Sequence, residues 1–179
     1  WFVADGAITD YFRSTGQNCT NGVCTTQVTL QNDDGDTNTL YGVERVRFID
    51  GVLAFDDDST AGGVYRLYQA AFDRKPDAPG LGYWIRTLDA GDTDTAGMSA
   101  HFIASPEFEA SYGADVSDVA FIELLYANVL DRGPDAAGAE YWQDRLAADA
   151  ARHEVLAQFA DSPENRAQVA DEIWSGIWY

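Results

Sequence analysis

The stretch DRKPDAPG at residues 73–80 returns as DRGPDAAG at residues 131–138, an offset of 58 residues. Two flanking dipeptides, LY before the stretch and YW after it, return at the same offset. Farther on, FIASPE at residues 102–107 matches FADSPE at residues 159–164 with an offset of 57. One residue is therefore lost in a connecting loop, where length changes cost little. The sequence predicts two tandem repeats of one unit.

Each repeat carries apolar residues at the spacing of one helix face. In both repeats they occupy positions i, i+3, i+4, i+7 and i+8. The residues are Val64, Leu67, Tyr68, Ala71 and Phe72 in the first repeat and Ile122, Leu125, Tyr126, Val129 and Leu130 in the second. We expect both sets to lie in the core of a bundle with three to four helices per repeat.

Each of the two repeats also contains sequence signals for the ends of its helices. In each repeat a proline is expected to stop the first helix and the following aspartate to cap the second. These residues are Pro76, Asp77, Pro134 and Asp135. The SPE motifs at residues 105–107 and 162–164 predict a later helix, because serine caps and proline fits the first turn. Tyr83, Trp84 and Leu88 are expected to give the second helix its buried face.

The N-terminal part has a different pattern. The runs at residues 25–30, 43–48 and 52–55 alternate apolar and polar residues, which favours half-buried strands. The acidic run DDDSTAGG at residues 56–63 then marks a break in composition. We therefore expect an α+β protein with a small N-terminal β-structure and an all-α bundle.

The expected domains follow from that break. They are a β-domain with acidic loops at residues 1–62 and a helical domain at residues 63–179, whose repeats cover about 63–115 and 116–179. Acidic residues outnumber basic ones by 30 to 11, for a net charge of −19. This charge repels phosphate backbones and anionic membrane surfaces. No apolar run approaches the ~20 residues of a membrane span, so neither nucleic acid nor membrane insertion is predicted.

The duplicated motif resembles a known family. The pattern Leu-Tyr, Asp-Arg-x-Pro-Asp-x-x-Gly, Tyr-Trp and Ser-Pro-Glu is similar to the helical repeat catalogued as domain of unknown function 4214. The segment at residues 40–56 looks like the β-segment that commonly precedes that repeat. The family resembles phycobilisome linker repeats in its loop pattern and occurs at the C-terminal ends of type I secreted RTX-type proteins, adhesins and S-layer-like proteins. The resemblance thus implies secretion to the bacterial surface.

Two acidic segments are candidate Ca²⁺ sites. Residues 32–38, NDDGDTN, place side-chain oxygens at alternate positions around a glycine, as calcium loops do. The bidentate Glu that would complete an EF-hand is missing. The acidic triplet at the domain junction is the second segment. The candidate ligands are Asp33, Asp34, Asp36, Asn38, Asp56, Asp57 and Asp58. A solvated acidic turn remains the alternative for both.

The two interhelical loops are candidate ligand sites. Each pairs a guanidinium with two carboxylates, and such groups bind sugar hydroxyls well. A tryptophan in each repeat adds a ring for stacking on a sugar. The candidate residues are Asp73, Arg74, Asp77, Trp84, Asp131, Arg132, Asp135 and Trp142. The alternative is that these residues only cap helices, fix turns and fill the core. Trp1, Trp174, Trp178 and Tyr179 are freer to form a surface platform.

The two cysteines, Cys19 and Cys24, bracket an Asn-Gly pair that favours a tight turn. A disulfide that closes a hairpin is expected, which implies an oxidising compartment. A metal site with two thiolates is the alternative, but both histidines lie far along the chain.

Enzyme motifs are sparse. The sequence has no Gly-x-Ser-x-Gly elbow, no phosphate-binding glycine loop and no His-Glu-x-x-His run. We therefore expect a non-enzymatic protein. The resemblance to the repeat family implies a C-terminal module of a secreted bacterial adhesin or surface protein, and the acidic loops and aromatic residues suggest that it is calcium-assisted and carbohydrate-binding. The alternative is a secretion or assembly module whose partner is a surface-layer component rather than a small ligand.

Overall fold

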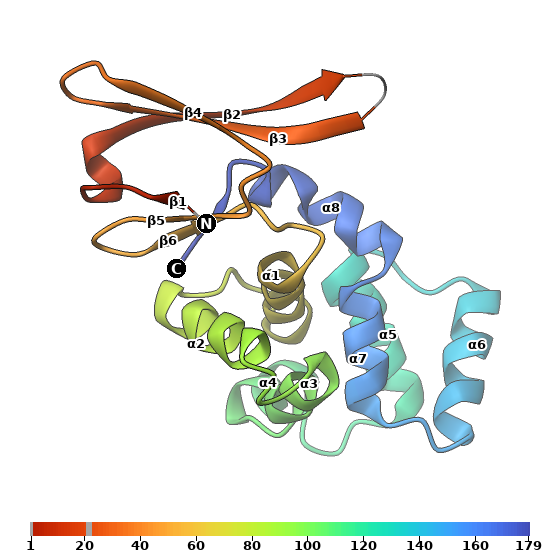
Figure 1. Ribbon diagram of the computed structural model, residues 1–179. Helices are drawn as coiled ribbons and strands as arrows, with labels where there is room; N and C mark the ends of the chain where they lie inside the picture. Colours follow the sequence, from red (N-terminus) through yellow and green to blue (C-terminus); the bar gives the residue numbers. More distant parts are fainter. Residues whose placement is uncertain (1, 21–22) are drawn as a thin grey trace. The chain divides into compact units, whose positions relative to one another are not determined.

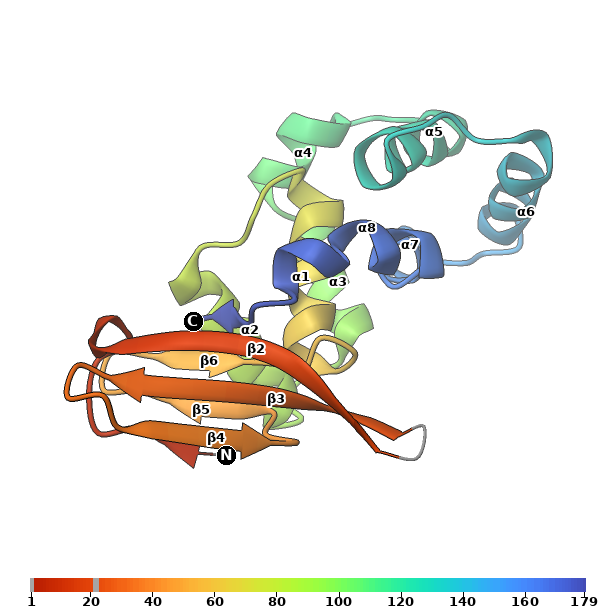
Figure 2. The ribbon, with the colours of Figure 1, turned by 90° about the horizontal axis from the view of Figure 1, so that it is seen from above.

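A computed structural model describes residues 2–20 and 23–179, and of Phe12, Val23 and Cys24 only the backbone. The chain divides into two compact units (Figures 1 and 2). Unit 1 contains residues 1–62 and 170–179, and unit 2 contains residues 63–169. N-terminal strands are followed by helices, as in the predicted α+β class, and this prediction is confirmed.

Unit 1 contains two β-sheets that face each other (Figure 1). Its elements are the strands β1 (Phe2–Val3), β2 (Tyr11–Thr20), β3 (Val23–Asn32), β4 (Thr37–Tyr41), β5 (Arg45–Arg47), β6 (Val52–Ala54) and β7 (Ile177–Trp178), and the short 3-10 helix η1 (Ile8–Asp10). One sheet has the strand order β1-β5-β6-β7 and the other β2-β3-β4. The expected strands near residues 25–30, 43–48 and 52–55 are therefore present.

The core of unit 1 lies between these sheets. Val28 and Leu30 of β3 are fully buried, as are Val46 of β5 and Leu53 of β6. Side chains alternate between the two faces of a strand, so the neighbours of Val28 and Leu30 along β3 point away from the core. The sheet β2-β3-β4 thus has one face on the core and one facing outward.

The last residues of the chain complete the other sheet. Strand β7 pairs antiparallel with β6, and the ring of Trp178 lies 6.0 Å from that of Phe48. Sequence reasoning instead assigned this segment to the helical domain. Gly176, with φ +99°, lies in the turn that follows the helix ending at Ile173, and Ile177 is then buried against the sheet. Helical periodicity contains no signal for such pairing between distant residues.

Eight helices follow in the described chain. They are α1 (Thr60–Phe72), α2 (Ala78–Asp89), α3 (Thr95–Ile103), α4 (Pro106–Tyr112), α5 (Asp118–Leu130), α6 (Ala136–Ala147), α7 (Arg152–Ala160) and α8 (Pro163–Ile173). The bounds of α5 and α6 lie 58 residues after those of α1 and α2, and the bounds of α7 lie 57 residues after those of α3. Helices α3 and α7 pack against each other.

The two predicted apolar stripes, on α1 and α5, lie in the core. All ten residues are at most 9% exposed. The prediction for α2 was wrong, because Leu81 and Ile85 form its buried face and Tyr83 is 57% exposed. Leu81 and Ile85 are one helical turn apart, and Trp84 lies at the flank of that face. None of the described helices has the length and apolar character needed to cross a bilayer.

Candidate functional site

The loop after α1 and the loop after α5 are held by the same pair of contacts. Arg74 donates two hydrogen bonds to Glu107, at 2.5 and 3.1 Å, and Arg132 donates two to Glu164, at 2.7 and 2.8 Å. The aspartates that sequence reasoning paired with these arginines lie farther away. Arg74 is 3.9 Å from Asp77 in the closest contact between them. The glutamates were missed, although their Ser-Pro-Glu motifs recur in both repeats, 57 residues apart.

The aspartates of both loops shape the backbone. Asp77 accepts a hydrogen bond from the N–H of Gly80 at 2.8 Å, and Asp135 accepts one from the N–H of Gly138 at 3.0 Å. Both are N-caps, as predicted. Asp73 and Asp131 adopt left-handed backbone, with φ of 49° and 51°, directly after α1 and α5. These residues end both helices before the prolines that were expected to stop them.

Charge in these loops is balanced locally. The hydrogen bonds from Arg74 lower the pKa of the Glu107 carboxyl, and those from Arg132 lower the pKa of Glu164. The N–H of Gly138 lowers the pKa of Asp135. The guanidiniums and carboxylates form hydrogen bonds with one another, so the arginine–glutamate pair of each loop stabilises the fold. We call these two pairs the structural joints. Ligand binding by their side chains stays a prediction.

The paired tryptophans are only half-buried. The ring of Trp84 lies 5.5 Å from that of Phe102, and the ring of Trp142 lies 4.8 Å from that of Phe159. The neighbouring tyrosine in each helix, such as Tyr141 at 51%, is more exposed. A sugar that approaches either helix would therefore meet the tyrosine more readily than the tryptophan.

The first predicted calcium loop is a tight turn between β3 and β4. Asn32 accepts a hydrogen bond from the N–H of Asp36 at 2.8 Å, and Gly35 has φ +89°. The carboxylates of this turn, from Asp33, Asp34 and Asp36, are exposed, and Asn38 lies on β4 opposite Leu30. Nowhere in the described residues do three His, Cys, Asp or Glu side chains gather as a metal site. Calcium binding here stays a prediction.

The acidic triplet at residues 56–58 contains one buried aspartate and two exposed ones. Asp56 is buried, forms an ion pair with Arg45 at 2.9 Å and accepts a hydrogen bond from the N–H of Ala61. It therefore anchors the start of α1. Asp57 and Asp58 are exposed. A Cβ at Gly62 would collide with the carbonyl of Asp57, so this glycine lets the helix start close to the loop.

A cavity of about 220 Å³ opens beside this loop in unit 1. The long hairpin β2–β3 contributes Thr15, Gln17 and Thr26 to its lining. The loop that contains the acidic triplet, which we call the acidic loop, contributes Asp57 and Asp58. Gln17 and Thr26 are directly opposite each other, on the core side of the sheet beyond Val28. The cavity is therefore the polar continuation of the core of unit 1.

Trp174, just after α8, lines the same cavity and is 48% exposed. Of the predicted aromatic platform, Trp174 thus stands beside the acidic loop, Trp178 packs in unit 1, and Trp1 lies outside the described residues. Sequence reasoning missed the hairpin residues Thr15, Gln17 and Thr26, whose polar alternation along the strands is the available signal.

The comparison with protein families bears on the helical part of the chain. Residues 99–169 match Domain of unknown function (DUF4214). The DUF4214 segment contains Glu107, Arg132, Asp135 and Glu164, and so includes the complete second loop. The predicted resemblance is confirmed for this segment. No curated protein and no solved structure matches the chain.

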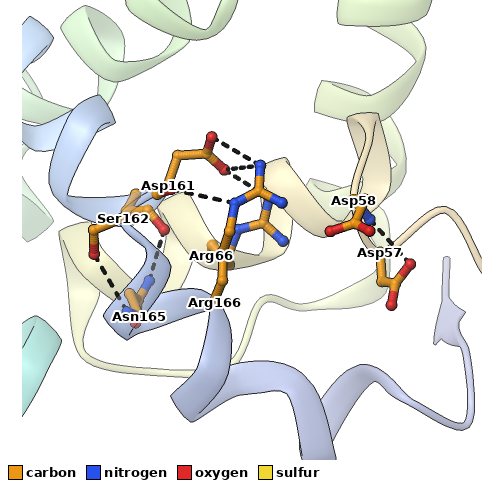
Figure 3. A network of polar contacts seen from close by, with 8 residues as sticks. Asp57, Asp58, Arg66, Asp161, Ser162, Asn165 and Arg166 are labelled. Carbon is orange, nitrogen blue, oxygen red and sulfur yellow. Dashed lines mark hydrogen bonds and ion pairs between the residues drawn. The ribbon is translucent and has the colours of Figure 1, made fainter.

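The turn between α7 and α8 of the DUF4214 segment contains a polar network (Figure 3). Asp161 accepts hydrogen bonds from Arg66 at 2.7 Å and from Arg166 at 2.9 Å, and Asn165 donates one to the carbonyl of Ala160. Burial works to raise the pKa of Asp161, but the bonds from both arginines outweigh it and lower the pKa. Arg66 is 3% exposed, so its guanidinium is not available to a ligand and this network stabilises the fold.

The cysteines lie at the tip of the hairpin β2–β3. Cys19 is opposite Cys24 in the backbone register, and opposed Cα atoms are about 4.5–5.5 Å apart. A disulfide fits this separation. The side chain of Cys24 and the turn residues Asn21 and Gly22 lie outside the described residues. The disulfide therefore stays a prediction.

Proposed function

We propose that this chain is a non-enzymatic, glycan-binding module of a secreted bacterial adhesin or surface protein and that the cavity of unit 1 holds the sugar. The observation that supports it is an exposed Trp174 beside Asp57 and Asp58, with hydroxyl and amide side chains across the cavity. An indole ring stacks on the apolar face of a sugar, and carboxylates accept hydrogen bonds from its hydroxyls.

The size and charge of the cavity limit which class of sugar it can bind. Drug-sized ligands occupy sites of roughly 300–1,000 Å³, whereas this cavity measures about 220 Å³. It therefore suits one sugar residue at the end of a glycan. Its two carboxylates and the net charge of −19 disfavour anionic sugars. A neutral or amine-bearing sugar is the proposed ligand.

A panel of soluble mono- and disaccharides tests this proposal, because the cavity accommodates one sugar residue. Wild-type protein should bind at least one neutral glycan, and Trp174→Ala should abolish that binding. Tyr83→Ala is the matched control, because it removes an exposed ring of unit 2. Binding that survives Trp174→Ala, or that is absent for every glycan, would exclude the cavity as a sugar site.

Calcium is proposed as an assisting ion at the exposed carboxylates of unit 1. The melting temperature is measured with calcium and with a chelator, for wild-type protein and for Asp57→Asn/Asp58→Asn. A rise with calcium that the double variant loses supports a site at the cavity. An identical melting temperature with chelator and with calcium would exclude a structural ion.

The second candidate function is a secretion or assembly module in which residues 63–115 and 116–179 are two copies of the DUF4214 unit. The observation that favours it is the recurrence of the same arginine–glutamate pair and aspartate cap in both loops. Type I export of the chain without residues 171–179 is the test. Gly51→Ala, which keeps those residues but crowds Trp178, is the control. Normal export of the shortened chain would contradict the proposal.

A further inference from the structure

The sheet β2-β3-β4 has an outward surface that no described element of unit 1 covers (Figure 2). Val28 and Leu30 point into the core, so the alternate positions point outward. The register aligns Ser14, Thr29 and Thr39 across the three strands, with Gln27 and Tyr41 in the next row. We call this surface the outer face; its central side chains are those of Ser14, Thr25, Gln27, Thr29, Thr39 and Tyr41.

The outer face is uncharged in a strongly charged chain. The sequence has 41 charged residues, the sum of 30 acidic and 11 basic ones. None of them stands at an outward position of the described sheet between residues 14 and 41, where Ser, Thr, Asn, Gln, Gly and Tyr alternate with inward residues. Exposed edge strands usually carry charges that discourage association. Here the edge strands β2 and β4 lack them on this side.

The face is also open and long. Ser14, Thr25 and Thr39 are exposed, and Tyr41 is 56% exposed. The six-residue step from Thr25 to Gln31 on β3 spans about 20 Å at the usual rise of a strand. Such a surface accommodates several units of an extended polymer, whereas the cavity accommodates one sugar.

We propose that the outer face binds a neutral polysaccharide chain. Its hydroxyl and amide groups both donate and accept hydrogen bonds, as sugar hydroxyls do, and Tyr41 offers a ring for stacking. A net charge of −19 repels polyanions, and the face supplies no cation to offset that repulsion. A second copy of the chain would meet the same repulsion. This inference rests on the proposed glycan-binding function but uses the side of the sheet opposite to the cavity.

Sedimentation with insoluble cellulose, chitin and starch tests the inference. Wild-type protein should bind at least one of them, and binding should not depend on NaCl concentration because no charges take part. Ser14→Lys/Thr39→Lys and Ser14→Glu/Thr39→Glu should each weaken binding about tenfold or more, because a charge buried against a neutral polymer loses its hydration. Charges of both signs are used so that a simple change of net charge is distinguished from damage to the face.

Matched controls place the same charges on exposed helical positions, in Thr95→Lys/Gln143→Lys and Thr95→Glu/Gln143→Glu, which should bind as wild type does. Trp174→Ala should keep polysaccharide binding. Tyr41→Ala serves if the charged variants melt early, and it should also weaken binding. Unchanged binding in the face variants, loss of binding in Trp174→Ala, or no sedimentation with any polymer overturns the inference. Soluble-sugar binding that depends on Trp174 would still support the cavity.

Discussion

Arg132 connects three parts of the DUF4214 segment through one side chain. Its guanidinium forms the double hydrogen bond with Glu164, donates to the carbonyl of Gly133 at 3.2 Å and lies 4.8 Å from the centre of the Tyr126 ring. A planar guanidinium can make all these contacts at once, whereas a lysine ammonium cannot. Arg74 makes the corresponding contacts with Glu107, Lys75 and Tyr68.

Acid should weaken both joints. The folded state lowers the pKa of Glu107 and of Glu164, so their contribution to stability is complete above the unfolded value of about 4.3. It is lost as the pH falls through the lower folded values. The melting temperature should therefore fall between pH 5 and pH 3, and Glu164→Gln should flatten that fall. Glu140→Gln, at an exposed position of α6, is the control, and an equal flattening by both would contradict the prediction.

Gly138 faces the hydroxyl of Tyr126. A Cβ at this position would collide with that hydroxyl, and the ring is buried and cannot move aside easily. We expect Gly138→Ala to lower the free energy of unfolding by about 1–3 kcal/mol. Gly133→Ala, whose Cβ meets nothing within 4 Å, should change it by less than about 0.5 kcal/mol.

Removing the hydroxyl should relieve part of this collision. The double variant Gly138→Ala/Tyr126→Phe should therefore be destabilised less than the sum of its single variants, as measured by urea unfolding. A loss of stability in Gly138→Ala no larger than in Gly133→Ala would show that the tyrosine can move.

The hairpin β2–β3 should be closed by the bond between Cys19 and Cys24. A loop this short stabilises by about 2 kcal/mol on the chain-entropy model. Unfolded, unreduced protein should show no titratable thiol, and two should appear after reduction. Cys19→Ser/Cys24→Ser should lower the free energy of unfolding by about that amount. Two thiols before reduction would contradict the prediction.

Much of the helical part could be predicted from the sequence. Its stops, caps and apolar stripes are local patterns, and Asp77, Asp135 and the α1 and α5 stripes lie as expected. Trp84 was misplaced because an aromatic residue at a helical position predicts contact with the core but not how much of the ring stays exposed.

The candidate site was less predictable because its residues are far apart in the sequence. The acidic loop and Trp174 were each noted, but their meeting with Gln17 and Thr26 depends on strand pairing and on the path of the chain after α8. Pairing between segments that are far apart in the chain produces no regular spacing of residues in the sequence from which it could be predicted. The glutamate partners of Arg74 and Arg132 were missed for the same reason, since 33 and 32 residues separate each pair.

Unit 1 draws its strands from both ends of the described chain. Deleting residues 177–179 removes β7 and the packing of Trp178, which should cost about 2–4 kcal/mol for the buried apolar groups. Amide hydrogen exchange should then speed up at residues 45–54 and stay slow in α5. Trp174→Ala, which removes a ring but no strand, is the control. Equal loss of protection in both units would contradict the division of the chain into units.

The position of β7 sets an order of events during synthesis. All of unit 2 is made before Ile177, so its locally connected helices can fold while the sheet of unit 1 still lacks its final strand. Until then, β6 presents an unpaired edge, the kind of surface that recruits strands from other chains. A newly made chain is therefore most vulnerable to aggregation just before residues 177–178 emerge from the ribosome, and crowded expression should favour misassembly through β6.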